Sequence, residues 1–114
     1  MSNKVEKPWG SYENLMDEEY GKVKRIIIKP GESPSYQYHH KRSEVWVILT
    51  GLAKIKIDGK VTCHNPGEIV IIPKEHKHQI ENIGDDDLIF VEVQVGEYFG
   101  EDDIVRVEDK YGRV

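Results

Sequence analysis

The 114-residue sequence has a single cysteine, no cluster of basic residues, and no apolar run near the roughly 20 residues that a membrane-spanning helix needs. The lone thiol, Cys63, excludes an internal disulfide and fits a reducing compartment, so we expect a cytoplasmic protein. The N-terminal MSNKVEKPWG lacks an apolar h-region, so we expect no secretory signal and no membrane partner. The net charge of −5 disfavours nucleic acid as a partner, because phosphate backbones bind clustered Lys and Arg.

The chain also lacks a linker, a low-complexity tract and a helical stripe of apolar residues through its middle. Its length suffices for one hydrophobic core. Runs rich in Val and Ile, separated by turn residues at intervals of about 8–12 residues, predict short strands of a sandwich or small barrel. We therefore expect one all-β domain over residues 1–114, with a core at about 22–96, an N-terminal arm at 1–21 and a C-terminal segment at 97–114.

Two stretches carry specific structural expectations. Asp58-Gly59 predicts a two-residue type I′ hairpin, because that turn needs positive φ at both positions. The segment Gly100–Lys110 is ambiguous from its pattern. Its acidic start suits the first turn of a short helix, whereas its alternating apolar residues suit a strand or a covering arm.

Strand alternation brings four potential metal ligands together. Gln37 and His39 lie two residues apart and therefore share one face of a strand. If the next strand pairs antiparallel with the first through a turn at 41–43, Glu44 approaches His39. His78 then completes the set from a distant strand. The sequence predicts a metal centre made of Gln37, His39, Glu44 and His78.

Two imidazoles, one carboxylate and one amide oxygen suit one divalent ion, and Zn, Mn, Co, Ni and Fe all remain open. A single pair of histidines near a carboxylate often lies in a solvated surface turn. Two spaced segments in order, on predicted strands with glycines at both ends, favour the metal centre instead. Such a centre stays net positive and polarises hydroxyl or carbonyl oxygens of a substrate.

These two segments resemble the two motifs of the cupin superfamily, with Gln37 where many cupins place a histidine and Glu75 where glycine is usual. Longer phrases narrow the resemblance to the cupin domain of type II mannose-6-phosphate isomerases. The phrases are PWGSYE at Pro8–Glu13, VKRIIIKPGE at Val23–Glu32, HHKRSEVW at His39–Trp46 and EVQVGEYFGEDDIVRVEDKYGR at Glu92–Arg113. The resemblance implies a cupin barrel, that is, a double-stranded β-helix or jelly roll, in a single domain.

In that family the domain often forms the C-terminal part of a bifunctional enzyme with a mannose-1-phosphate guanylyltransferase. Since the nucleotidyltransferase half is absent from the sequence, the resemblance implies a stand-alone isomerase-type cupin. Family habit implies a homodimer, and we expect the aromatic residues Tyr98, Phe99 and Tyr111 to cover an edge or to form the contact. Lys41 replaces the third histidine of the family pattern Q-x-H-H-H-R-x-E, which bears on substrate identity.

The reaction implied by the resemblance interconverts mannose 6-phosphate and fructose 6-phosphate, with the metal as electrophile. Glu92 is the candidate base if its face looks into the barrel, and a solvated residue if it does not. Arg106, in the GEDDIVR phrase, is the second candidate catalytic residue. The candidate contacts to the phosphosugar are Arg25, His40, Arg42, Lys74 and Gln94.

Two other functions remain open from the sequence. Two histidines and a carboxylate also hold Fe(II) with open positions, as in a small-molecule dioxygenase. A sugar- or sugar-phosphate-binding cupin without catalysis is the alternative that is not an enzyme, and Lys41 and Glu75 keep it open.

Overall fold

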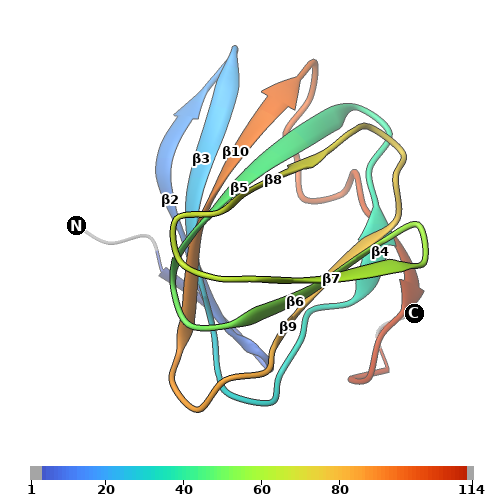
Figure 1. The fold of residues 1–114 in the computed structure, drawn as a ribbon. Coiled ribbons are helices and arrows are strands. Elements are labelled where there is room, and N and C mark those ends of the chain that lie inside the picture. Colours follow the sequence, from blue (N-terminus) through green and yellow to red (C-terminus); the bar gives the residue numbers. More distant parts are fainter. Residues whose placement is uncertain (1–3, 113–114) are drawn as a thin grey trace.

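The computed structural model describes residues 4–112 as two antiparallel β-sheets that face each other (Figure 1). Within these residues no helix is long and apolar enough to cross a membrane. The six-stranded sheet has the order β1 (Lys4–Lys7), β2 (Gly10–Glu18), β3 (Gly21–Ile28), β10 (Leu88–Gly96), β5 (Arg42–Thr50) and β8 (Ile69–Ile72). The five-stranded sheet has the order β11 (Val105–Glu108), β4 (Tyr36–Tyr38), β9 (His78–Asn82), β6 (Ala53–Ile57) and β7 (Lys60–His64).

Alternating side chains on the central strands build the core between the sheets. On β5, Trp46 and Ile48 point inward, while the alternating residues Val45 and Val47 lie on the outer face. The inward residues of β3 and β10 follow the same alternation and meet those of the second sheet. Fully burying an Ile, Leu or Phe side chain contributes about 1.5–3 kcal/mol, so this cluster holds the sheets together. The cluster includes Ile26, Ile28, Ile55, Ile80, Leu88 and Phe90.

The strand register aligns inward side chains in rows across each sheet, and toward one end of the barrel these rows turn polar. Residues directly opposite in an antiparallel pair share a face and have neighbouring side chains. The rows of the six-stranded sheet are Lys24–Glu92–Trp46–Val70 and Lys22–Gln94–Glu44–Ile72. The facing row of the five-stranded sheet is Arg106–Gln37–His78–Ile57.

Two local expectations have clear outcomes. The Asp58-Gly59 hairpin is confirmed, since Ile57 pairs with Lys60 and the two turn residues have φ of 47° and 85°. The turn at 41–43 does not form a hairpin, and that expectation is wrong. β4 pairs with β9 and β11, whereas β5 pairs with β10 and β8 in the other sheet. The chain crosses from one sheet to the other between β4 and β5. Such crossings are common in a jelly roll, where strands that pair in a sheet are often distant in sequence.

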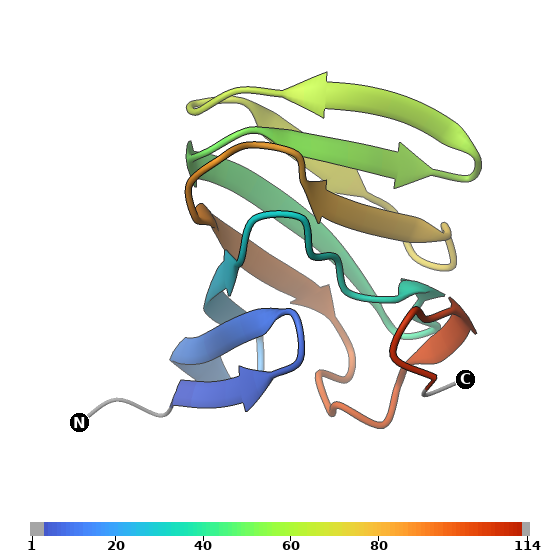
Figure 2. The same cartoon turned by 90° about the horizontal axis from the view of Figure 1, so that it is seen from below.

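The terminal segments contribute strands to both sheets (Figure 2). Residues 4–18, which the sequence pattern placed in an arm, form β1 and β2, and β2 pairs along its length with β3. Gly10 permits that close approach, because a Cβ there would lie 2.0 Å from the Ile27 carbonyl oxygen. The ambiguous segment Gly100–Lys110 contains the strand β11, which pairs with β4.

Asn82 links three segments of backbone at the end of the barrel opposite the polar rows. It is fully buried, and its amide nitrogen donates to the carbonyl oxygens of Ile28 and Asp86, each at 2.8 Å. Its amide oxygen accepts a hydrogen bond from the Gly84 N–H at 2.9 Å. The side chain thereby ties the turn between β9 and β10 to the end of β3.

We expect Asn82→Ala to lower the free energy of unfolding by about 2–3 kcal/mol, because it leaves buried backbone groups without partners. Urea denaturation measures this change. Glu81→Ala on the same strand, where the side chain is half-exposed, is the matched control and should change stability by about 0.5 kcal/mol or less. A loss at Asn82 no greater than the loss at Glu81 would contradict the role of this amide.

Candidate metal centre

Three buried side chains from the two sheets converge between them. His39 follows β4, Glu44 lies on β5 and His78 begins β9, and each is at most 3% exposed. One ligand atom from each lies within 4.8 Å of the others. His39 Nε2 is 3.3 Å from one Glu44 carboxylate oxygen, and His78 Nε2 is 4.0 Å from the other. Glu44 therefore approaches His39 as predicted, but across the sheets and not through a hairpin.

Backbone carbonyls orient both imidazoles. His39 Nδ1 lies 2.6 Å from the Asp103 carbonyl oxygen, and His78 Nδ1 lies 3.0 Å from the His76 carbonyl oxygen. A carbonyl oxygen only accepts hydrogen bonds, so each Nδ1 carries the proton and each Nε2 keeps its lone pair. Second-shell contacts of this kind fix the tautomer of metal-binding histidines.

The residues fit a divalent metal. His78 Nε2 is buried and has no hydrogen-bond partner among the described residues, although a buried polar atom normally has one. Two ligand atoms that each lie about 2.1 Å from one ion are about 3.0–3.5 Å apart. The separation of 3.3 Å between His39 Nε2 and Glu44 matches this geometry. Burial lowers the pKa of His39 to about 4, so its imidazole is neutral, as a ligand must be.

Gln37, the fourth ligand expected from the sequence, lies on the inner face beside His78. It lies directly opposite His78 in the pairing of β4 with β9, so the two side chains share the inner face. It is half-buried, lines the same cavity as His78, and accepts a hydrogen bond at its amide oxygen from the Ser35 hydroxyl at 3.0 Å.

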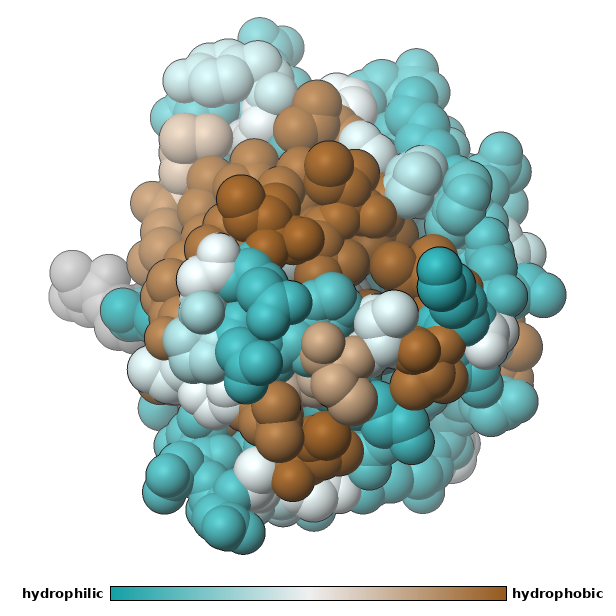
Figure 3. Space-filling view, in the orientation of Figure 1, coloured by the Kyte–Doolittle hydropathy of each residue, from teal (hydrophilic) through white to brown (hydrophobic). Residues whose placement is uncertain are grey.

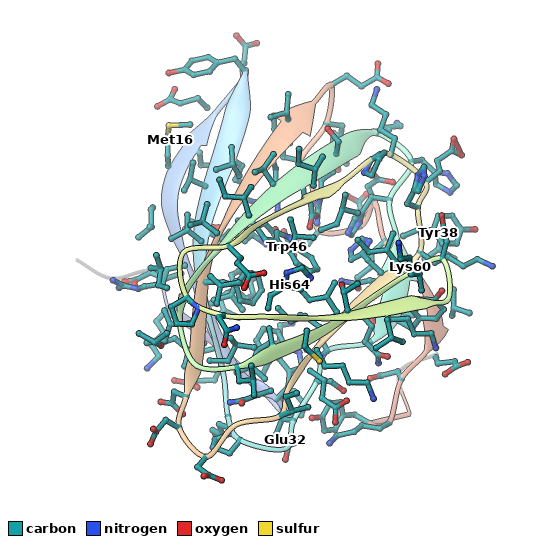
Figure 4. The ribbon with its side chains drawn as sticks, viewed as in Figure 1. Met16, Glu32, Tyr38, Trp46, Lys60 and His64 are labelled. Atoms are coloured by element: carbon teal, nitrogen blue, oxygen red, sulfur yellow. The ribbon has the colours of Figure 1, made fainter. Side chains whose placement is uncertain are left out.

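Glu44 stays ionised because cations and donors surround it. Burial opposes its ionisation, but electrostatic interactions with His78, His39 and Arg42 lower its pKa to about 2. Arg42 Nε and the indole nitrogen of Trp46 each donate to its carboxylate at 2.9 Å. Trp46 itself lies between the sheets (Figure 4). A carboxylate held in this way is available as an anionic metal ligand.

Glu92 has the opposite protonation. Burial and the nearby charge of Glu44 raise its pKa to about 8, so it carries a proton at neutral pH. The Gln94 amide donates to it at 2.6 Å. Its inward orientation resolves the alternative left open by the sequence, since Val91 and Val93 occupy the outer face instead.

A cavity of about 100 Å³ opens beside this cluster. Its apolar lining includes Trp9, Ile26, Ile80 and Phe90. Its lining also carries charged groups, among them Lys7, Lys24, Arg42, Glu92, Glu101 and Arg106. Arg106 lies opposite Gln37, and its Nε is buried without a hydrogen-bond partner among the described residues.

The structure does not bring all of the candidate substrate contacts to this cavity. The Arg25 side chain is 46% exposed and pairs with Glu13 on the outer face. Lys74 is exposed, and His40 is exposed beside Glu75 at 3.4 Å. Gln94 is fully buried but contacts Glu92 instead of lining the cavity.

Sequence reasoning missed four residues around the site. Lys22 and Lys24 point inward, as their alternation with Ile26 and Ile28 on β3 would have indicated. Glu101 reaches Lys24 from the loop between β10 and β11. Asp103 accepts hydrogen bonds at its carboxylate from the backbone N–H groups of His40 and Lys41, and no local pattern signals this long-range contact.

The fold and the buried His/Glu cluster together define a cupin. Solved structures with the same architecture include the oxalate decarboxylase of Lactobacillus farciminis, at 22% identity and a TM-score of 0.81 over 93% of this chain and 33% of that one. A Cupin 2 conserved barrel domain protein from Salinispora arenicola has 25% identity and a TM-score of 0.66, covering 74% of this chain and 73% of that one. The predicted all-β cupin fold is confirmed.

The chain belongs to the family described as mannose-6-phosphate isomerase C-terminal, whose model matches residues 1–109. Mannose-1-phosphate guanylyltransferase ManC of Salmonella typhimurium is 45% identical over 114 residues, which are 100% of this chain and 24% of that protein. Alginate biosynthesis protein AlgA of Pseudomonas putida is 42% identical over 109 residues, 96% of this chain and 22% of that protein. The chain thus spans about a quarter of the length of these relatives, and the resemblance stated from the sequence is confirmed.

We expect the full chain to bind about one equivalent of a divalent ion such as Zn or Mn, measured by elemental analysis after dialysis. His78→Ala should abolish this binding, because it removes a ligand whose lone pair has no other partner. His76→Ala is the matched control, since that imidazole is exposed and lies outside the cluster. Equal metal content in the two variants would refute the centre.

Proposed function

We propose that this chain is a metal-dependent sugar-phosphate isomerase that interconverts mannose 6-phosphate and fructose 6-phosphate. One observation carries the proposal: a buried His39–Glu44–His78 cluster lies beside the protonated Glu92, at a cavity that also carries cations. The description of the family supports the same substrate. The phosphosugar partner and the cytoplasmic location remain predictions.

The reaction moves a proton between C1 and C2 of the sugar through an enediol. It needs an acid–base group, polarisation of the carbonyl oxygen, and cations for the phosphate. His39, Glu44, His78 and Gln37 would hold the metal, which when bound supplies Lewis-acid polarisation of that oxygen.

Glu92 suits the proton transfer. A group with a pKa of about 8 exchanges its proton readily near neutral pH, where both of its forms are accessible. The Gln94 amide fixes the carboxyl group at 2.6 Å and limits its rotation. Trp46 and Phe90 exclude water from the adjoining wall, which preserves the raised pKa.

Arg106 and Arg42 supply positive charge around the substrate. The buried, unpartnered Nε of Arg106 favours an anionic or hydroxyl oxygen in the cavity. Arg42 Nη1 is also buried without a hydrogen-bond partner among the described residues, while Arg42 Nε donates a hydrogen bond to Glu44. These cations favour a phosphosugar over the neutral diketones or thiols of a dioxygenase, the alternative that the two histidines and one carboxylate leave open.

We expect the wild-type chain to form fructose 6-phosphate from mannose 6-phosphate, and Glu92→Gln to lower kcat about 100-fold or more with a smaller change in KM. A coupled assay with Zn, Mn, Co or Ni measures both constants. Glu97→Gln, an exposed carboxyl group just after β10, should retain full activity. Absence of turnover with all four metals would refute the assignment, and oxygen consumption with Fe(II) would point to the dioxygenase.

We also propose a homodimer that forms through the outer face of the six-stranded sheet. Figure 3 shows a continuous apolar surface over this region. Ile71, Ile69, Val95 and Leu49 on this face are 65%, 63%, 50% and 46% exposed. The half-buried valines of β5 and β10 lie between them in the strand register, so these side chains form one contiguous apolar face.

A second copy is the occupant that this face fits best. A C2 dimer brings the same face of both copies together, and two sheets pack face to face at about 10 Å. Of the aromatic residues expected to cover an edge or to form a dimer contact, Phe99 is 9% exposed and Tyr111 packs against the core, whereas Tyr98 is 41% exposed. Their part in a dimer stays a prediction.

We expect light scattering at micromolar concentration to give twice the mass of one chain. Ile69→Lys combined with Ile71→Lys should halve that mass, because charge within an apolar interface is costly to desolvate. Val61→Lys, at a side chain 48% exposed on β7, is the control and should leave the dimer intact. A monomeric wild-type chain would exclude this contact.

A further inference from the structure

Two lysines on the inner face of β3 are buried, and one of them, Lys24, lines the cavity. Lys22 is 7% and Lys24 is 4% exposed, although lysine is rarely buried this deeply unless it is paired. Both approach a single carboxylate, Glu101, which lies 2.7 Å from Lys24 Nζ and 3.6 Å from Lys22 Nζ. Two ammonium groups therefore share one negative charge, and the cluster keeps an excess of positive charge.

Glu101 is much more exposed than the lysines. Its side chain is 51% exposed, whereas those of Lys22 and Lys24 are 9% and 5% exposed. It belongs to the loop that joins β10 to β11 and forms part of the cavity lining. The lysines have other partners, because Lys22 Nζ donates to the Phe99 carbonyl oxygen at 3.4 Å and Lys24 Nζ lies 4.1 Å above the Tyr12 ring.

The strand register places these lysines at a definite distance from the metal centre. Lys24 lies opposite Glu92 on β10, and Glu92 lies opposite Trp46 on β5. In the adjacent row, Gln94 on β10 lies between Lys22 on β3 and Glu44 on β5. β3 and β5 are two strand spacings apart, or about 10 Å, which is the scale of an extended hexose phosphate. Such a substrate carries its phosphate at one end and its reacting carbons at the other.

We propose that Lys24, supported by Lys22 on the same face of β3, forms the phosphate-binding end of the cavity, and that Glu101 is a displaceable anion that pairs with both lysines until phosphate takes its place. This inference rests on the proposed function, since it assigns the two ends of the phosphosugar. A phosphate monoester carries a charge of about −1.5 to −2 at neutral pH and matches two ammonium groups better than one carboxylate does. When phosphate binds the lysines, Glu101 is released from them, and the loop at residues 97–104 that carries Glu101 changes its contacts.

The ion pair also has a purely structural interpretation, in which Glu101 only neutralises the lysines. The two interpretations differ in the effect of neutralising Glu101 on phosphate binding. A displaceable anion competes with phosphate, so its loss tightens binding. A structural partner does not compete, so its loss leaves phosphate affinity unchanged or weakens it.

Isothermal titration of the full chain with inorganic phosphate tests this. We expect Glu101→Gln to lower the Kd for phosphate about tenfold, and Lys24→Met to raise it by about as much. In the Lys24→Met background, Glu101→Gln should have no further effect, since its competitor role requires the lysine. Glu97→Gln, in the same loop but exposed, is the matched control. An unchanged or higher Kd in Glu101→Gln, or a gain that persists without Lys24, would overturn the inference.

A measurement on the wild-type chain does not depend on the folding of any variant. Phosphate and mannose 6-phosphate should each speed amide hydrogen exchange in residues 97–104, whereas mannose should not. Unchanged or slower exchange with phosphate overturns the displacement. These results are separate from catalysis, because phosphate effects without turnover would leave this inference standing and remove the isomerase. Turnover without these phosphate effects would leave the isomerase standing and remove this inference.

Discussion

The site depends on a carboxylate that is buried and remains charged. Glu44 is 2% exposed, and an isolated charge at that depth would be strongly unfavourable. Its two oxygens are therefore surrounded by Arg42, Trp46 and the imidazoles of His39 and His78. Removing one partner of a buried charge typically costs about 3–5 kcal/mol, so each of these side chains constrains the others. The geometry of the metal centre thus follows from the hydrogen bonds and opposite charges that the buried Glu44 carboxylate requires.

Much of this arrangement could be predicted from local sequence. Alternation identified Gln37 and His39 as neighbours on one face, and the Asp58-Gly59 turn fixed its hairpin. The pairing of β5 with β10 and β8 could not be predicted, because it joins segments that no short-range pattern connects. The predicted hairpin at residues 41–43 is wrong for that reason. The predicted proximity of Glu44 to His39 is nevertheless confirmed, because the two residues meet across the facing sheets.

The second feature that the sequence predicted poorly is which face of a strand points into the barrel. On β10, Val91 and Val93 face outward while Glu92 and Gln94 face inward, which inverts the usual apolar-in pattern. Hydrophobicity alone favours the opposite orientation. On β3, exposed Arg25 directly follows buried Lys24, and the alternation of Lys24 with Ile26 and Ile28 indicates which of the two points inward. Because of the same inversion, polar groups line the cavity while apolar side chains cover the outer face.

The inversion also explains how an acidic chain can hold an anion. Its net charge is −5, but cations concentrate on the inner faces. The raised pKa keeps Glu92 neutral at neutral pH, so the nearby carboxylates that carry charge against the buried lysines and Arg42 are Glu44, Glu101 and Asp103. A divalent ion on His39, Glu44 and His78 would make the balance more positive still. The outer acidic surface then affects only long-range approach, which salt screens, whereas the buried cations act where screening is weak.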